Sequence, residues 1–386
     1  MLDGLIHLAA GARDPLIDVP ALEPLKQFIN WIMVPERSLP LFTLAFVGML
    51  AFYKLWTRPV VFALISLAGA AGYFGLFAID NNYRLILEKP DNIPITLMII
   101  LTAFFTWLAF RQAAINDERV TRGEPLLEAN KDDKVLVWPD LVYTELICLM
   151  LATAFLVTWA LIFRAPLESP ANPAGPPNPS KAPWYFLGLQ EMLVYFDPWM
   201  AGVALPGLIV TGLICMPYID TNPKGNGYYT FAQRRFAITT WMFGFLILWV
   251  VLIVFGTFLR GPNWNFFGPT EYWDSHKQVP LTNVNLSEYF WQSRQFFGFG
   301  LLQPVPSNPL VREALGIAFT LAWVLVLPVL LAKTVMRGLF EQMGSLRFYI
   351  MAFHFVVMAL MPVKMVLRWT MNLKYFVYLP EFNLNL

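Results

Sequence analysis

The segment from Lys181 to Glu191 combines residue types that suit the binding of a hydrophobic redox molecule. It follows a proline-rich stretch, and proline favours the first turn of a helix, so a short apolar helix is expected over Trp184–Phe196. That helix is too short to cross a membrane. Glu191 stands two turns after Trp184 on the same face. Aromatic walls beside a group that takes a proton are what a quinol ring needs; a packing helix whose Glu faces water is the alternative.

The three histidines, His7, His276 and His354, limit the metal chemistry of the chain. Two haems that are each held by a pair of histidines need four, so this chain does not hold two such haems alone. His354 falls within an apolar run, where an ionisable residue is a functional candidate. A neutral histidine hydrogen-bonded to a neighbouring helix is the favoured reading. No metal is expected to be bound by this chain.

The elements that position these residues follow from composition. Of 386 residues, 57% are hydrophobic and 14% are charged, against roughly 25% charged in a soluble domain. The net charge of +1 offers no basic excess for nucleic acid. We expect an all-α, polytopic membrane helix bundle of about eight transmembrane helices, plus a short surface helix in an outer loop. The expected spans are Leu39–Tyr53, Pro59–Ile79, Ile93–Phe110, Leu141–Phe163, Trp199–Tyr218, Phe236–Leu259, Ala314–Ala332 and Phe348–Val363.

Orientation follows from the basic residues of the connections. Four short connections hold 13 of the 27 Lys and Arg residues, which favours the cytoplasmic side for 54–58, 111–138, 219–235 and 333–347. Both termini and the long loops Arg164–Pro198 and Arg260–Glu313 are then outside. The run Leu22–Val34 mixes charges with apolar residues and could form an interfacial helix.

Several stretches, in order, carry a family resemblance. They are Trp138-Pro139-Asp140-Leu141-Val142-Tyr143, Pro170-Ala171-Asn172-Pro173, Ala182-Pro183-Trp184-Tyr185, Ala201-Gly202-Val203, the run Met216-Pro217-Tyr218-Ile219-Asp220 through Tyr229, and Arg234-Arg235. Over about residues 135–260 the chain resembles the C-terminal half of cytochrome b. It resembles in particular subunit IV of cytochrome bf-type complexes and the equivalent subunit of bacterial menaquinol-oxidising bc complexes. We expect residues 1–134 to form an N-terminal membrane region of about three spans without haem histidines. Residues 261–386 add a long aromatic outer loop and two further spans.

The resemblance implies a quinol-oxidation site, with one departure. The family has a Pro-Glu-Trp-Tyr motif there, and alignment on Trp184-Tyr185 puts Pro183 where the family has its Glu. Glu191 is the candidate proton acceptor in its place, with Asp197 behind it. The implied quinol-binding residues are Pro183, Trp184, Tyr185, Leu187 and Glu191.

A second site on the cytoplasmic side is also expected. Asp140, Glu145, Lys224, Arg234 and Arg235 could line an inner quinone site or relay protons to it. For the two arginines, anchoring by the positive-inside rule is the favoured alternative. For Glu145, pairing with a neighbouring helix is the alternative.

The function implied by the resemblance is that of a membrane subunit of a bc-type quinol:cytochrome c oxidoreductase in respiratory or photosynthetic electron transfer. It contributes to the outer-face site that oxidises a quinol, menaquinol in the bacterial branch, with proton translocation. The implied b-type haem and iron–sulfur cluster belong to partner subunits, and none is ligated by this chain. Those partners are a di-haem cytochrome b N-terminal-type subunit, a Rieske-type iron–sulfur protein and a c-type cytochrome subunit, in a bacterial cytoplasmic membrane.

Two other classes remain as alternatives. The chain could be a non-catalytic anchor or scaffold of a redox complex with a degenerate quinol pocket, because the motif Glu and the haem histidines are missing. A transporter is disfavoured, since only His354 falls near a membrane midplane.

Overall fold

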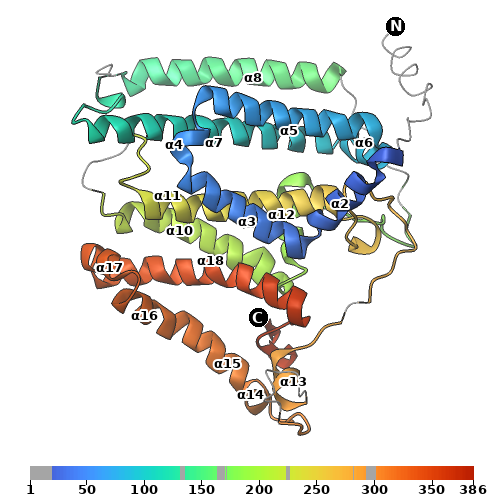
Figure 1. Ribbon diagram of the computed structural model, residues 1–386. Coiled ribbons are helices and arrows are strands. Elements are labelled where there is room, and N and C mark those ends of the chain that lie inside the picture. Colours follow the sequence, from blue (N-terminus) through green and yellow to red (C-terminus); the bar gives the residue numbers. More distant parts are fainter. Residues whose placement is uncertain are drawn as a thin grey trace. The chain divides into compact units, whose positions relative to one another are not determined.

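The regular secondary structure of the described residues is almost entirely helical (Figure 1). The computed structural model describes residues 20–130, 135–162, 170, 172–222, 227–280, 282–292 and 301–386. In these ranges the strands are β1 (Tyr378–Leu379) and β2 (Leu384–Asn385), which pair antiparallel in the C-terminal tail with Tyr378 opposite Asn385.

Seven helices of the described residues are long and apolar enough to cross a membrane, which confirms the prediction of a polytopic helical membrane protein. They are α5 (Pro59–Ile79), α7 (Asn92–Thr121), Val137–Ile162 with α8 (Val142–Ile162), Met200–Ile219 with α10 (Leu205–Ile219), Arg235–Leu259 with α11 (Arg235–Met242) and α12 (Val251–Val254), Ala314–Lys333 with α15 (Ala314–Leu321) and α16 (Leu327–Lys333), and α18 (Ser345–Met371). A bent pair, α2 (Glu23–Met33) and α3 (Pro35–Ala51), makes an eighth if it is one span.

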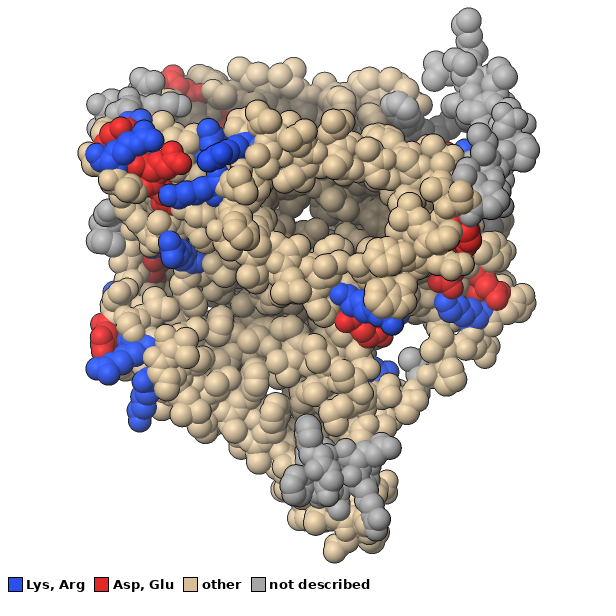
Figure 2. Space-filling view, viewed as in Figure 1, with Lys and Arg blue, Asp and Glu red and all other residues tan. Residues whose placement is uncertain are grey.

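The sequence sets where these helices begin. α5 starts at Pro59, whose missing N–H costs nothing in a first turn. The helix α6 (Asn81–Leu87) is capped by Asp80, which accepts a hydrogen bond from the Tyr83 N–H. On the face drawn in Figure 2, charged side chains gather toward helix ends, and the surface over the helix middles is uncharged. That pattern suits helices whose middles contact hydrocarbon.

The described chain divides into two compact units. The first comprises the described residues of Ala51–Pro177 and Asn226–Arg235, with α4 (Tyr53–Trp56), α5, α6, α7 and α8. At the end of α7, Asp117 accepts hydrogen bonds from the Tyr53 hydroxyl at 2.8 Å and from the Phe231 and Ala232 N–H groups at 3.2 and 3.0 Å. Within this unit the most apolar stretches of Pro59–Ile79 and Val137–Ile162 have no buried residue. Their surfaces are therefore available to lipid or to other subunits.

The second unit comprises the described residues of Val19–Leu50, Asn178–Gly225 and Phe236–Leu386. Its hydrophobic core joins α3, α9 (Leu187–Met192), α10, the span Arg235–Leu259 and α18. Tyr195, Phe255 and Met365 are fully buried there. The core therefore sits under the loop that carries the predicted quinol site. The predicted domain boundaries at residues 135 and 260 stay a prediction. They were drawn from resemblance to a family, whereas the two units are defined by compactness.

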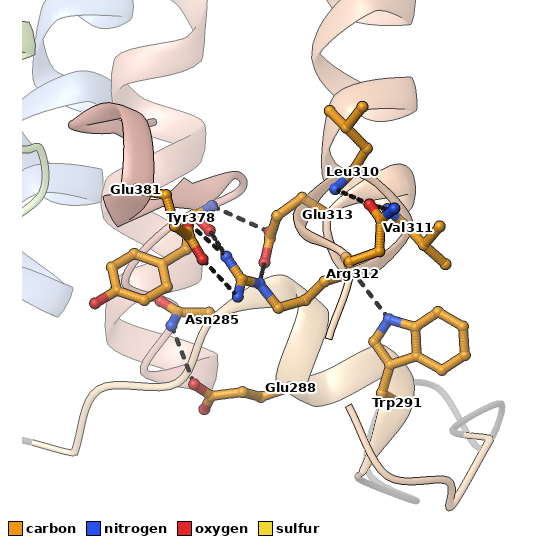
Figure 3. A network of polar contacts seen from close by, with 10 residues as sticks. Asn285, Glu288, Trp291, Leu310, Val311, Arg312, Glu313, Tyr378 and Glu381 are labelled. Atoms are coloured by element: carbon orange, nitrogen blue, oxygen red, sulfur yellow. Dashed lines mark hydrogen bonds and ion pairs between the residues drawn. The ribbon is translucent and has the colours of Figure 1, made fainter. Parts of the chain in front are cut away.

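Ion pairs fasten the C-terminal tail to the start of a span (Figure 3). Arg312, the last residue of α14 (Pro309–Arg312), donates from both terminal nitrogens to Glu381 at 3.1 Å and from Nη2 to the Tyr378 carbonyl at 3.0 Å. The next residue, Glu313, has a fully buried side chain and accepts from Arg312 Nε and from the Tyr378 N–H. The tail is therefore held by main-chain and side-chain groups together.

Candidate functional site

The predicted surface helix is shorter than the sequence indicates. Trp184–Phe186 form one turn of 3₁₀ helix, α9 covers Leu187–Met192, and turns complete the segment to Phe196. The preceding loop is tied onto α9 by the Gln190 side chain, which accepts from the Ala182 N–H at 2.8 Å and donates to the Ser180 carbonyl at 2.9 Å. One glutamine therefore fixes the approach of the proline-rich stretch to the helix.

Two glycines allow α9 to lie directly on the span Arg235–Leu259. A methyl group on Gly188 would stand 3.1 Å from the Trp249 ring, and one on Gly256 would stand 3.0 Å from the Leu187 carbonyl oxygen. Leu187 and Met192 are buried in this contact. The close approach orients the helix, because its buried face is then set by the neighbouring span.

Glu191, the candidate proton acceptor, lies on this buried face and forms an ion pair with Arg260. Its side chain has no exposed surface, and its two oxygens accept from Arg260 Nε at 2.9 Å and Nη2 at 2.7 Å. Arg260 also donates from Nη1 to the Trp264 carbonyl at 3.0 Å. A bidentate guanidinium–carboxylate pair is strong and directional. For Glu191 to take a proton from a substrate, this pair must open or the proton must pass through a neighbouring hydroxyl.

Such a hydroxyl is present in Tyr195. Its OH donates to Glu191 Oε1 at 3.3 Å, and the residue is fully buried. Burial, followed by the negative charge of Glu191, raises the pKa of Tyr195 well above its ordinary value. Burial lowers the pKa of Arg260, but the charge and hydrogen bonds of Glu191 outweigh it, so the net shift is upward. The guanidinium of Arg260 therefore stays charged and the phenol of Tyr195 stays neutral across the physiological range.

The aromatic residues of the predicted site lie on the other side of the segment, toward the surface. Tyr185 and Phe186 are each 48% exposed, and Trp184 is half-buried. Their rings contact one another in series, with centroids 5.6 Å apart for Trp184–Tyr185 and 4.6 Å for Tyr185–Phe186. Pro183 is exposed. The structure therefore gathers the predicted aromatic wall but turns Glu191 and Leu187 inward, away from it.

A cleft of about 400 Å³ opens beside α9. It is lined by Asn178, Pro179, Ser180, Gln190, Leu193, Val194, Asn263 and Trp264, and Glu191 is not among these residues. One wall is fixed by a reciprocal amide pair: Asn178 Nδ2 donates to Asn263 Oδ1, and the Asn263 N–H donates to Asn178 Oδ1. Asn263 and Trp264 both have positive φ, at 58° and 56°. Because non-glycine residues rarely adopt this conformation, the surrounding bonds must hold it in place.

The last span also reaches this site. The Trp369 ring meets the Tyr195 ring edge-on at 5.9 Å between centroids. Tyr375 donates its hydroxyl to Asp197 at 3.0 Å, and burial, then this hydrogen bond, raises the pKa of Tyr375 to about 12. Asp197, predicted to stand behind Glu191, is thus paired with the tail rather than with Arg260.

Four of the five residues predicted for an inner site belong to the first unit. Asp140 and Glu145 are exposed and make no ion pair with another described residue. Arg235 is exposed at the start of α11, and Arg234 is half-buried. Lys224 lies outside the described residues. The inner quinone or proton path stays a prediction.

The histidines show no metal-ligating arrangement in the parts of the chain that the structure describes, and no group of three His, Cys, Asp or Glu is gathered there. His354 in α18 bonds through Nδ1 to the Ile350 carbonyl at 2.8 Å and lies 3.1 Å from the Thr211 hydroxyl on α10 through Nε2. This is the interhelical hydrogen bond favoured from the sequence. His7 lies outside the described residues.

Arg260 is the site residue that sequence reasoning missed. It follows the last apolar residue of the span, Leu259, and precedes Gly261-Pro262. An arginine at the end of a span normally reads as an interfacial anchor. One further signal was available: Glu191 and Arg260 are separated by two spans, so they emerge on the same side of the membrane.

The comparison with known families supports the resemblance in this part of the chain. The family described as Cytochrome b(C-terminal)/b6/petD matches residues 170–268, so this stretch carries a domain of that family. No solved structure matches the chain. The matched stretch contains the proline-rich loop, α9, the two following spans and Arg260.

Proposed function

Taking the cytochrome b C-terminal domain at residues 170–268 as the premise, we propose that the chain is a membrane subunit of a bc-type quinol:cytochrome c oxidoreductase. It contributes to the outer-face site that oxidises quinol, menaquinol in the bacterial branch, within a respiratory or photosynthetic chain. The membrane in question is the bacterial cytoplasmic membrane. Proton translocation follows if the protons of quinol leave on the outer side.

One observation carries the proposal. The stretch that matches the family is the stretch that forms the loop-and-helix segment clasped to a span end by Glu191 and Arg260, with Trp184, Tyr185 and Phe186 on its surface. Exposed aromatic rings at the boundary of a membrane protein are suited to stack against a ring-shaped apolar ligand. In this proposal they form one wall, and the di-haem cytochrome b N-terminal-type subunit provides the other.

In this proposal the steps of quinol oxidation are divided among the subunits of the complex. A quinol loses two electrons and two protons, one electron going to a Rieske-type iron–sulfur protein and the other to b haem. A c-type cytochrome subunit then receives electrons from the iron–sulfur protein. In this proposal the electron carriers belong to the partner subunits, and this chain contributes the position of the ligand and the path of a proton.

Glu191 keeps its place as the proposed proton acceptor, and two contacts of its side chain support a route for the proton. The Tyr195 hydroxyl touches Glu191 Oε1, and Arg260 holds both carboxylate oxygens. A proton reaches the carboxylate when the guanidinium shifts toward its other partner, the Trp264 carbonyl. Arg260 is thus the positioning residue of the pair.

The alternative is a non-catalytic scaffold with a degenerate quinol pocket. It is favoured by the same ion pair, because a carboxylate that uses both oxygens to fasten a loop is also a structural tie. It is favoured too by the position of Glu191 outside the cleft of about 400 Å³.

The first experiment purifies the tagged chain in mild detergent, identifies the proteins that accompany it, and records haem spectra with dithionite and with added quinol. Co-purifying b haems that quinol reduces support the oxidoreductase. A colourless preparation, or haems that ignore quinol, supports the scaffold.

Variants of the ion pair then separate a chemical role from a structural one. Glu191→Gln is expected to slow quinol oxidation by about tenfold or more. The same change leaves Arg260 without its counter-charge, so the double variant Glu191→Gln with Arg260→Gln is the control. Restored assembly with slow turnover supports a proton-accepting role, whereas full recovery of turnover removes Glu191 from the chemistry. Tyr185→Ala tests the aromatic wall against Tyr272→Ala, which removes a 72% exposed tyrosine elsewhere in the second unit.

A further inference from the structure

The helix α2 has an apolar side that the described chain leaves uncovered. Leu25, Phe28 and Trp31 recur every three residues on one face and are 47%, 54% and 54% exposed. At 100° per residue, Ile29 and Ile32 fall on the same side, and Glu23, Lys26, Gln27 and Asn30 fall on the other. No residue of α2 is buried. An amphipathic helix of this kind buries its apolar stripe against something outside the described chain.

The opposite side of α2 is occupied by the second unit itself. Asn30 Oδ1 accepts from the Thr270 N–H at 3.0 Å and from the Thr270 hydroxyl at 2.9 Å. A Cβ atom on Gly268 would overlap the Asn30 side chain, so only glycine fits the loop at that point. The polar face of α2 is therefore hydrogen-bonded to the loop that follows Arg260, whereas the apolar face remains exposed.

The direction of α2 is set by its connection to α3. The two helices are joined at Val34 and bend by 82°. α3 has 17 residues, about 26 Å at 1.5 Å per residue, and its Leu39 and Phe46 are buried in the core of the second unit beside other spans. If α3 crosses the hydrocarbon alongside these spans, the 82° bend places α2 close to the membrane plane.

The junction between the two helices has the chemistry of a headgroup region. The Arg37 guanidinium lies 4.2 Å from the centroid of the Trp31 ring, and its Nη1 donates to the Trp31 carbonyl at 2.8 Å. Trp31 and Phe28 stack with centroids 6.1 Å apart. Tryptophan with an adjacent arginine is typical of the membrane–water boundary, where one side of the group is apolar and the other wet.

We propose that α2 lies in the lipid headgroup layer, with Leu25, Phe28 and Trp31 turned toward the acyl chains, and that it seats the Gly268–Thr270 loop at the membrane surface. The partner is the bilayer, because the stripe is separated by a single residue from α3, whose Leu39 and Phe46 pack among the membrane spans of the second unit. This position of α2 is independent of quinol chemistry. In it, α2 contacts lipid through its apolar face and the Gly268–Thr270 loop through its polar face.

The test uses spin labels on a background in which Cys148 and Cys215 are changed to serine. Single cysteines replace Phe28 on the stripe, Glu23 on the polar side, and Leu64, a 61% exposed residue of span α5, as the hydrocarbon reference. The chain, with whatever subunits purify with it, is placed in lipid nanodiscs. Collision of each label with oxygen and with a water-soluble nickel chelate is measured by electron paramagnetic resonance.

The expected result is that the label at 28 collides several-fold more with oxygen than with nickel, between the values at 64 and 23, while the label at 23 shows the reverse preference. Equal nickel access at 28 and 23 would overturn the proposal, because the stripe would face water. Loss of access to both reagents at 28 would also overturn it, because protein would cover the stripe. A label at Leu25, one turn earlier, repeats the measurement should the Phe28 variant fail to fold.

Discussion

Two ion-pair sites fasten loops to the ends of spans, and they do so in different environments. Glu191 and Arg260 form one pair in which both side chains are largely inaccessible to water. Arg312 divides its donors between a buried carboxylate, an exposed carboxylate and a main-chain carbonyl. Breaking a buried pair strongly lowers stability, because removal of one partner leaves an uncompensated charge in a medium of low dielectric constant. A distributed site spreads the loss over several groups, and water compensates part of it.

The largest effect is expected for Arg260→Ala. It leaves the Glu191 carboxylate buried without a counter-charge, which costs about 3–5 kcal/mol. A large fall in the midpoint of thermal unfolding in detergent should follow, measured by tryptophan fluorescence or by loss of the monodisperse peak after heating.

Its control is the double variant Arg260→Gln with Glu191→Gln, which keeps hydrogen-bonding side chains but removes both charges. We expect it to recover most of the lost stability, since the cost comes from the orphaned charge. A double variant as unstable as Arg260→Ala would show instead that packing around the pair carries the stability.

A smaller effect is expected for Glu313→Ala in the distributed site. The change removes the acceptor for the Tyr378 N–H and for Arg312 Nε, at a cost of about 1–3 kcal/mol for buried groups left unpaired. Hydrogen exchange of the tail, followed by mass spectrometry of peptides covering 374–386, should accelerate. The matched control is Glu341→Ala, which breaks an exposed pair with Arg337 and should leave the unfolding midpoint unchanged.

The smallest effect concerns Glu381 and depends on pH. Its hydrogen bonds with Arg312 lower the pKa of Glu381 below the ordinary 4.5, so the stabilisation is complete above that pH. It is lost as pH falls through the lowered pKa, when the carboxyl takes a proton. The difference in unfolding midpoint between the wild type and Glu381→Gln should shrink below about pH 4.5. A difference that stays constant down to pH 3 would remove the ion pair from the account.

Hydropathy was sufficient to predict that the spans exist, because about 20 consecutive apolar residues have few alternatives to crossing a bilayer. The residues at which the spans end were less predictable. The last span runs to Met371 rather than Val363, past Lys364 and Arg368. The predicted span stopped just before these charges, but Lys364 is fully buried with its Nζ 4.5 Å from the centroid of the Phe376 ring. That contact comes from the returning tail, which no local pattern reveals.

The site shows the same limit. The resemblance placed a cytochrome b C-terminal-like stretch here, and the family match over residues 170–268 confirms the family. The roles of the motif residues stay a prediction. The orientation of Glu191 could not be foreseen, since it depends on Gly188 and Gly256 bringing two helices into contact and on a partner 69 residues away. Spacing along a helix gives the face of a residue but not what covers that face.

The separation of Glu191 and Arg260 has a consequence for biosynthesis. Glu191 leaves the ribosome before the two spans Met200–Ile219 and Arg235–Leu259, and Arg260 follows the second of them. Until both spans have been inserted, the carboxylate has no guanidinium and α9 has no surface on which to pack. The loop that carries α9 therefore reaches its final structure only after the span Arg235–Leu259 has been inserted into the bilayer. A chain that ends between 219 and 235 would therefore leave Glu191 without its partner and the face of α9 that packs on Arg235–Leu259 uncovered.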